Sequence, residues 1–219
     1  MTHHPHLEAI YSCRFAGKEA QHNQVWQVLT RHYFQRWIKP ADAVLDLGAG
    51  YCEFINNIQA ARKYALDLNP ATPLKAANDV VGLWEDVTKP WSAASESVNA
   101  VFRGSFFAHL PTKQDFKHCL SDYRVLCSQG LLIALGPNIR FAYDVYWDFF
   151  DHYLPLSDRS VVESTEPAGF RTELVVPRFL PFAMRGKLPS WRALVRLYLW
   201  FPLAQRILGK QFLVVMRKP

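Results

Sequence analysis

The sequence has few cysteines, no long hydrophobic run and no apolar leader segment. Its four cysteines among 219 residues show neither CxxC spacing nor the density of a disulfide scaffold, so we expect them to be reduced and structural. The longest apolar run, residues 197–204, is far shorter than the ~18 residues that a membrane-spanning helix needs. The polar residues 1–6 do not resemble a signal peptide, which predicts a cytoplasmic protein. The cysteines are Cys13, Cys52, Cys119 and Cys127.

The composition excludes wholesale disorder, because half of the residues are hydrophobic and a fifth are charged. Much of the net charge of +6 lies near the C-terminal end, where basic residues alternate with apolar and aromatic ones over residues 188–209. Three interpretations stay open: contact with a membrane surface, a lid over an anionic acceptor, or ordinary packing with arginine head groups in water. Nucleic acid is a weaker alternative, since no added nucleic-acid module is recognisable.

Short apolar segments that resemble buried strands alternate with helical patterns over most of the chain. Helices are expected over residues 23–38, 52–60 and 112–127, the last ending before Gly130 as a C-terminal glycine. This alternation predicts a parallel α/β sheet with helices on both faces. The expected strands are Ala43–Leu47, Lys63–Leu68, Val80–Trp84, Val98–Phe102, Leu131–Gly136, Phe170–Phe179 and Gln211–Arg217.

Residues 44–54 read as a strand, a glycine turn and the start of a helix. Gly48 and Gly50 would let the backbone approach a ligand, and the helix start would offer free N–H groups. Glu53 stands where a dinucleotide fingerprint has its third glycine, and its charge would repel a pyrophosphate. A nicotinamide-dependent oxidoreductase is therefore the weaker interpretation of this turn.

Asp46 stands two residues before Gly48, and the resulting pattern resembles the first motif of class I S-adenosylmethionine-dependent methyltransferases. That motif reads acid-x-Gly-x-Gly-x-Gly, and Cys52 replaces its third glycine. Similar family segments follow in order, and they are residues 64–68, 84–87, 101–110 and 131–136. The resemblance implies a seven-stranded Rossmann-like sheet, mostly parallel, with an antiparallel last strand inserted beside the fifth. We expect one domain, with a helical cap at 1–38, a core sheet at 40–179 and 210–219, and a helical insert at 180–209.

The resemblance also implies S-adenosylmethionine (SAM) as the cofactor and S-adenosylhomocysteine (SAH) as the product. In the family, the acid at Asp46 reaches the methionine amino group, that at Asp67 the ribose hydroxyls and that at Asp86 the adenine. The N-terminal segment would fold over the cofactor and bring Tyr11 and Phe15 near it. The other expected cofactor contacts are Gly48, Gly50, Leu68, Val87 and Arg103.

Methyl transfer to a hydroxyl group benefits from a general base, and the histidines that follow the expected fourth and fifth strands are the candidates. These are His109 and His152, the latter with Asp148 four residues earlier, at helical pairing distance. No aspartate ends the fourth strand to begin a metal site, so a metal-independent reaction is expected. The aromatic segment 137–153 is expected to line the acceptor pocket. The pocket residues are Phe106, Tyr143, Tyr146, Trp147 and Asp148.

The expected acceptor is a small molecule or a lipid- or sugar-linked molecule with an oxygen or nitrogen nucleophile. A non-catalytic cofactor-binding or membrane-interacting module and an RNA-directed methyltransferase are the alternatives. The sequence predicts neither the acceptor's identity nor the oligomeric state.

Overall fold

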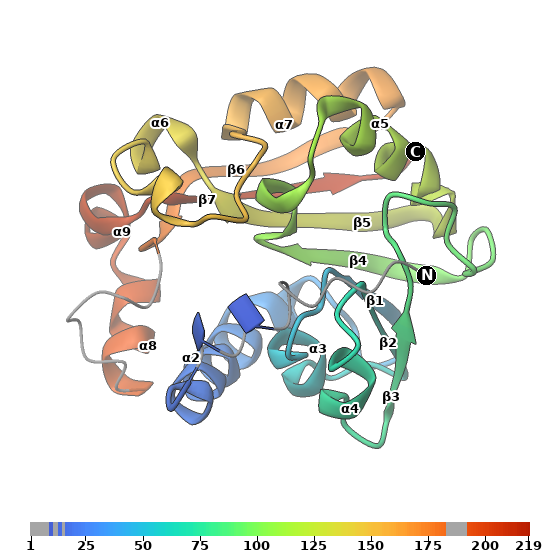
Figure 1. The fold of residues 1–219 in the computed structure, drawn as a ribbon, viewed down its shortest axis with the longest axis horizontal. Helices are drawn as coiled ribbons and strands as arrows, with labels where there is room; N and C mark the ends of the chain where they lie inside the picture. Colours follow the sequence, from blue (N-terminus) through green and yellow to red (C-terminus); the bar gives the residue numbers. More distant parts are fainter. Residues whose placement is uncertain (1–8, 11–12, 15, 183–191) are drawn as a thin grey trace.

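A seven-stranded sheet organises the chain in the computed structural model, which describes residues 9–10, 13–14, 16–182 and 192–219. The strand order is β3-β2-β1-β4-β5-β7-β6 (Figure 1). β1 to β5 are parallel to one another, whereas β7 is antiparallel to both β5 and β6. The expected fold class and the antiparallel insertion are thereby confirmed. The strands are β1 Ala43–Leu47, β2 Arg62–Asp67, β3 Val80–Trp84, β4 Val98–Gly104, β5 Leu126–Pro137, β6 Arg171–Leu180 and β7 Gln211–Arg217.

Helices cover both faces of the sheet because the side chains of its central strands alternate between two apolar layers. One layer includes Leu45 of β1 and packs beneath α5 and α7, while the other includes Val44 and packs against α2, α3 and α8 (Figure 1). In the second layer the rings of Phe54 and Phe102 stack with their centroids 3.7 Å apart. The helices are α2 Glu19–His32, α3 Glu53–Asn57, α4 Thr72–Lys75, α5 Lys113–Ser121, α6 Ile139–Ala142, α7 Asp158–Thr165, α8 Arg192–Trp200 and α9 Pro202–Leu208.

The expected helix over residues 112–127 is shorter than the pattern predicted. α5 stops at Ser121, a 3₁₀ turn spans Asp122–Val125, and Cys127 already lies in β5. Gly130 is an interior strand residue and not a helix C-cap, because the chain there pairs with β4 across an irregular register. A Cβ at Gly130 would lie 2.8 Å from the carbonyl oxygen of Cys127, so close backbone packing requires the glycine.

The other two expected helices are also shorter. The pattern over 23–38 becomes α2 followed by a 3₁₀ turn at Phe34–Arg36, and that over 52–60 becomes the single turn of α3. Ile58 ends α3 because its backbone is extended and leads into β2.

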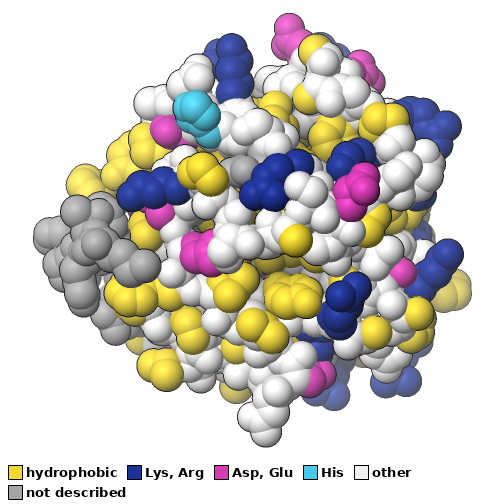
Figure 2. Space-filling model, turned by 90° about the vertical axis from the view of Figure 1, so that its right-hand side faces the viewer, with side chains coloured by type: hydrophobic (Ala, Val, Ile, Leu, Met, Phe, Trp, Pro, Cys, Tyr) yellow, Lys and Arg dark blue, Asp and Glu magenta, His cyan; other side chains and the backbone are white. Residues whose placement is uncertain are grey.

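α8 and α9 lie between β6 and β7 and present apolar side chains to the surface. Trp200 is 81% exposed and Ile207 is 63% exposed. None of the helices in the described part of the chain combines the length and the apolarity needed to cross a membrane. On the side of the molecule opposite α8 and α9, basic side chains are interspersed with acidic and hydrophobic ones and form no single patch (Figure 2).

Candidate functional site

The glycine turn after β1 has an unusual backbone that suits close approach by a ligand. Gly48, Gly50 and Cys52 have φ values of 72°, 53° and 62°, all in the left-handed region. A Cβ at Gly48 would lie 2.5 Å from Cδ2 of Phe106, so the ring leaves no room for a side chain there. Cys52, the departure from the family motif, therefore occupies a conformation that glycine adopts without strain. Its buried Sγ lies 3.5 Å from the carbonyl oxygen of Thr72.

Two buried carboxylates flank this turn at the carboxyl ends of β1 and β2. Asp67 accepts hydrogen bonds of 2.7 Å from the backbone N–H groups of Gly50 and Asn69. Burial nevertheless raises the pKa of Asp67, with those hydrogen bonds opposing the rise. Burial and the charges of Glu53 and Asp67 raise the pKa of Asp46 well above its usual value.

Neither Asp46 nor Asp67 has a lysine or arginine partner among the described residues. Asn69 adds an unmet donor, because its buried Nδ2 has no hydrogen-bond partner in the described structure. Buried acids are normally paired with a cation, so this site favours a ligand that carries positive charge and hydroxyl donors. The fit to the ammonium, sulfonium and ribose of SAM is good.

The residues expected at the ends of the second and third strands lie in different environments. Asp86 accepts hydrogen bonds from the backbone and the hydroxyl of Thr88, so it shapes the turn after β3. Val87 is buried in the apolar layer beneath α5. The carbonyl oxygen of Leu68 accepts a hydrogen bond of 2.9 Å from the indole of Trp84, which ties the ends of β2 and β3 together.

Arg103 lies in the core and is fully buried, which differs from the expected contact with cofactor. Its guanidinium lies 3.3 Å from the ring centroid of Phe107 and donates to the hydroxyl of Tyr123. Nε and Nη2 have no hydrogen-bond partner in the described structure, and burial lowers the pKa of Arg103. Arg103 can influence the glycine turn only indirectly, through Phe106, whose ring centroid is 4.9 Å away.

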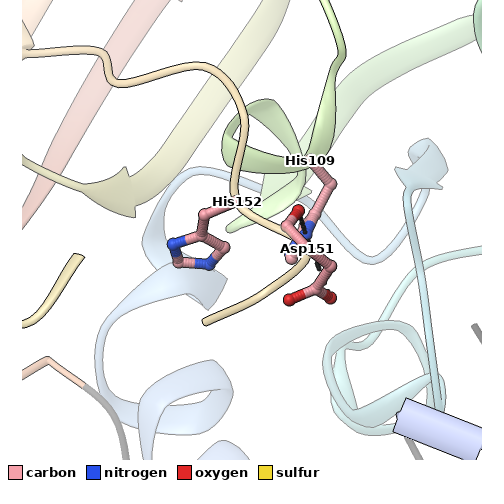
Figure 3. A group of neighbouring side chains, drawn as sticks. All are labelled: His109, Asp151 and His152. Carbon is pink, nitrogen blue, oxygen red and sulfur yellow. Dashed lines mark hydrogen bonds and ion pairs between the residues drawn. The ribbon is translucent and has the colours of Figure 1, made fainter. Parts of the chain in front are cut away.

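A second cluster forms where the turn after β4 meets the loop after β5, and it contains both candidate bases (Figure 3). Nδ1 of His109 lies 2.8 Å from the carbonyl oxygen and 3.3 Å from Oδ2 of Asp151. The rings of His109 and His152 are 5.0 Å apart. The loop is held against the turn because the N–H of Tyr153 donates to the carbonyl oxygen of Ala108 at 2.7 Å.

Both imidazoles of this cluster are held in the neutral form, which has a lone pair that can accept a proton. Nδ1 of His152 lies 3.0 Å from the carbonyl oxygen of Tyr146, which leaves Nε2 as the lone-pair nitrogen. Burial, reinforced by the neighbouring His109, lowers the pKa of His152 to about 4. Burial also lowers the pKa of His109. Both imidazoles are therefore neutral at pH 7.

Asp151 is the carboxylate of the cluster, and sequence reasoning did not select it. Burial opposes its ionisation, but the hydrogen bond from Arg14 and the charge of His109 lower its pKa. Arg14 reaches it from the N-terminal segment, with Nη2 2.5 Å from Oδ1. The ligating atoms of His109, Asp151 and His152 lie within 4.8 Å of one another, so the three residues could also face a metal ion.

The predicted pair of Asp148 and His152 is wrong. α6 ends at Ala142 and a separate 3₁₀ turn covers Tyr146–Asp148, so no helix places the two residues one turn apart. Asp148 is exposed, whereas His152 is buried and bonded to the Tyr146 carbonyl. Helical spacing misled the sequence reasoning, and the adjacent acid at 151 was the better signal.

The residues expected to line one acceptor pocket do not gather at one place. Phe106 packs on the glycine turn, while Tyr143 and Trp147 are 70% and 62% exposed. Tyr146 is buried, and its hydroxyl donates to the Leu154 carbonyl at 2.7 Å, so it stabilises the loop. Phe149 is the aromatic neighbour of the cluster, stacked on His152 at 4.8 Å. Two residues expected to cover the cofactor, Tyr11 and Phe15, lie outside the described residues.

Structure comparison finds methyltransferases with the same architecture. One chain belongs to the complex between the Trm112 methyltransferase activator of Haloferax volcanii and a methyltransferase candidate, with a TM-score of 0.69, 18% identity and 100% of both chains covered. A SAM-dependent methyltransferase of Archaeoglobus fulgidus has a TM-score of 0.68 and 16% identity, over 93% of this chain and 99% of that one. A Thermotoga maritima enzyme described as a possible histamine N-methyltransferase has a TM-score of 0.65 and 14% identity, over 95% and 99%.

No protein-family model matches the chain, and no curated protein matches it in sequence. At identities of 14–18% the likeness establishes the fold, which is that of the Rossmann-like class I SAM-dependent methyltransferases. The activity has to be argued from the site residues.

Proposed function

We propose that the protein transfers a methyl group from SAM to a small-molecule or lipid- or sugar-linked acceptor with an oxygen or nitrogen nucleophile. The observation that carries this proposal is the pair of buried, cation-free carboxylates, Asp46 and Asp67, beside the glycine turn. Their position at the carboxyl ends of β1 and β2 is where open α/β sheets bind nucleotide-like ligands.

In this proposal each acid contacts a different part of the cofactor. Asp67 accepts from the ribose hydroxyls, Asp46 neutralises the methionine ammonium, and Asp86 lies toward the adenine. Gly48 and Gly50 give the backbone the close approach that the cofactor requires. When bound, SAM supplies a methyl group already activated by its sulfonium, so positioning of the acceptor supplies much of the remaining rate.

The proton of a hydroxyl acceptor is taken by the cluster of His109, Asp151 and His152. His152 is the proposed base, because its Nε2 keeps a free lone pair while Nδ1 faces a carbonyl. His109 is held against Asp151, and the negative charge of Asp151 stabilises the positive charge that follows proton transfer. Phe106 and His109 share one 3₁₀ turn, Phe106–His109, which supports a short path from the glycine turn to the base.

We propose that the reaction does not depend on a metal ion. Asp151 is already neutralised by Arg14 at 2.5 Å, and a metal ion would have to displace that guanidinium. Nδ1 of both histidines faces a backbone carbonyl oxygen, which orients the rings for hydrogen bonding. Repulsion between Arg14 and a divalent cation therefore disfavours a metal at this cluster.

We further propose a cytoplasmic protein with a peripheral membrane contact through residues 188–209, which suits a lipid-linked acceptor. Exposed Leu197, Trp200 and Ile207 support this contact. The alternatives, a non-catalytic module and an RNA-directed methyltransferase, are distinguished by the acceptor that becomes methylated. When the protein is incubated with radiolabelled SAM and a cell extract, label should appear in the metabolite or lipid fraction of the extract. Label in RNA would contradict the proposed acceptor class. No label in any fraction would favour the non-catalytic module.

The cofactor assignment is tested by calorimetric titration of SAH into an Asp67→Asn variant. Loss of a charge-assisted hydrogen bond is expected to weaken SAH binding by about tenfold or more. Asparagine is preferred to alanine because the two oxygens of Asp67 each accept from a buried N–H group; asparagine keeps one of these acceptors, whereas alanine removes both. The matched control is Glu163→Gln on α7, an exposed acid that should leave SAH affinity unchanged. Wild-type affinity in Asp67→Asn would show that this acid does not hold the ribose.

A further inference from the structure

A basic cavity of about 780 Å³ lies between α2 and α8, outside the glycine turn and the histidine cluster. α2 and α8 lie side by side on the same face of the sheet (Figure 1). Cationic side chains line the cavity from both helices, and amide side chains complete its wall. The cations are Arg31, Arg192 and Arg196, His32 adds an imidazole, and two of the amides are Gln27 and Asn57.

The cavity carries positive charge that the described part of the chain does not neutralise. None of its described lining residues is acidic, and neither Arg31 nor Arg196 forms an ion pair with a described acid. Arg192 is fixed at the rim, because its Nη2 donates to Oε1 of Gln27 at 2.5 Å and so joins α8 to α2. Burial, followed by the charges of Arg196 and Arg31, lowers the pKa of His32, so the two arginines act on the same imidazole.

Helix stability accounts for only part of this arrangement. Arg31 and His32 lie in the last turn of α2, where cations interact favourably with the helix dipole. That effect does not explain why α8 adds Arg192 and Arg196 on the facing side. Bringing like charges together across a gap costs free energy, and an anion bound between them would recover it.

The chemistry of the lining identifies the anion. Guanidinium groups bind phosphate through two parallel N–H···O bonds, and amides bind the polar groups that accompany a phosphate. Proteins that bind single-stranded nucleic acid also supply aromatic rings for base stacking, and no phenylalanine, tyrosine or tryptophan lines the described cavity. The lining therefore favours a small phosphate-bearing group over a polynucleotide.

We infer that the cavity between α2 and α8 binds a phosphate group, carried either by a soluble metabolite or by a lipid head group. A lipid source is consistent with Leu197 and Trp200 of the same helix α8, which are 61% and 81% exposed. The inference does not depend on methyl transfer, since no residue of the cavity belongs to the proposed cofactor or base site.

Two probes distinguish the sources: inorganic phosphate, and phosphatidylcholine vesicles that contain phosphatidic acid. The test variant carries Arg31→Gln and Arg196→Gln. The matched control carries Lys117→Gln and Arg159→Gln, which remove the same charge from exposed positions on α5 and α7, across the sheet. Unfolding curves of both variants check that their stabilities are comparable.

Calorimetry is expected to show that wild type and control bind inorganic phosphate and that the test variant binds at least about tenfold more weakly. If the phosphate belongs to a lipid, wild type and control should co-sediment with the vesicles and the test variant should not. None of the three proteins should then bind inorganic phosphate measurably. Either pattern supports the inference. If the test variant does not fold, Arg31→Lys with Arg196→Lys keeps the charge without the planar fork and should still weaken binding several-fold.

Three outcomes would overturn the inference. Wild type could bind neither probe, or test and control variants could lose binding equally, which would indicate general surface charge. Tighter binding of a short RNA than of either probe, abolished in the test variant, would assign the cavity to a polynucleotide.

Discussion

Acidification should destabilise the protein through His152, whose imidazole is buried among His109, Asp151, Arg14 and Phe149. Its pKa is lowered from 6.5 to about 4 in the folded state, so the native protein binds fewer protons than the unfolded chain between these values. Stability then falls as the pH decreases through this interval. Above the unfolded pKa both states are neutral at this residue and the effect vanishes.

The size of the effect follows from the two pKa values. At 1.36 kcal/mol per pKa unit, the full difference is about 3 kcal/mol, reached only below the folded pKa. Near pH 5 the unfolded histidine is almost fully protonated and the native one is not, which gives a loss of about 2 kcal/mol relative to pH 8. The side chain is only 7% exposed, so solvent screening removes little of this.

Urea unfolding near pH 5 and near pH 8 measures this loss in wild type and in His152→Gln. Glutamine can still donate to the Tyr146 carbonyl but does not titrate, so the variant should lose about 2 kcal/mol less than wild type on acidification. His118→Gln, an exposed position on α5, is the control and should behave as wild type. If His152→Gln were as sensitive to acid as wild type, the buried neutral imidazole would be refuted.

Three further predictions concern Gly48 in the glycine turn and the buried pair of Arg103 and Tyr123. Gly48→Ala should lower the free energy of unfolding several times more than Gly17→Ala, for which we expect the ~1–2 kcal/mol cost of a left-handed alanine. Both glycines have φ near 70°, but only Gly48 is packed against Phe106. Equal losses in urea unfolding would show that the Phe106 ring moves aside. Arg103→Met should leave stability within about 1 kcal/mol of wild type or raise it, because it removes a buried charge with two unmet N–H donors. Tyr123→Phe alone should lower the free energy of unfolding by ~1–3 kcal/mol, because it leaves a further N–H donor of Arg103 without an acceptor. In the Arg103→Met background the same substitution should cost little. A large loss of stability in Arg103→Met alone would contradict this reasoning.

The sheet could be predicted from the sequence because its buried strands appear as short local runs of apolar residues. Residues 43–47 and 211–217 are almost continuously buried, and each apolar run coincides with one strand. Strand and helix ends were less predictable, since Cys127 and Gly130 lie in the irregular stretch of β5 between Leu126 and Leu131, the two residues that pair with β4. Periodicity cannot report such tertiary pairing.

The proposed cofactor acids could be located from the sequence because they end strands, whereas the proposed base cluster depends on loop conformation. Asp46 and Asp67 lie where the motif places them, at the ends of β1 and β2. Asp151 meets His109 only because the loop after β5 folds back on the turn after β4, and Arg14 reaches it across 137 residues. Neither contact leaves a spacing signal in the sequence.

The position of β7 affects how the chain can acquire its structure during synthesis. β7 is the last strand to be made, yet it lies inside the sheet between β5 and β6 with nearly every residue buried. Until residues 211–217 are available, β5 and β6 have no common neighbour and each exposes an unpaired edge that can pair with another chain. The N-terminal strands can assemble earlier, but the half of the sheet that bears the proposed base cluster can close only once residues 211–217 have been made. Loss of this one strand would therefore leave an open, aggregation-prone sheet and not a slightly shortened protein.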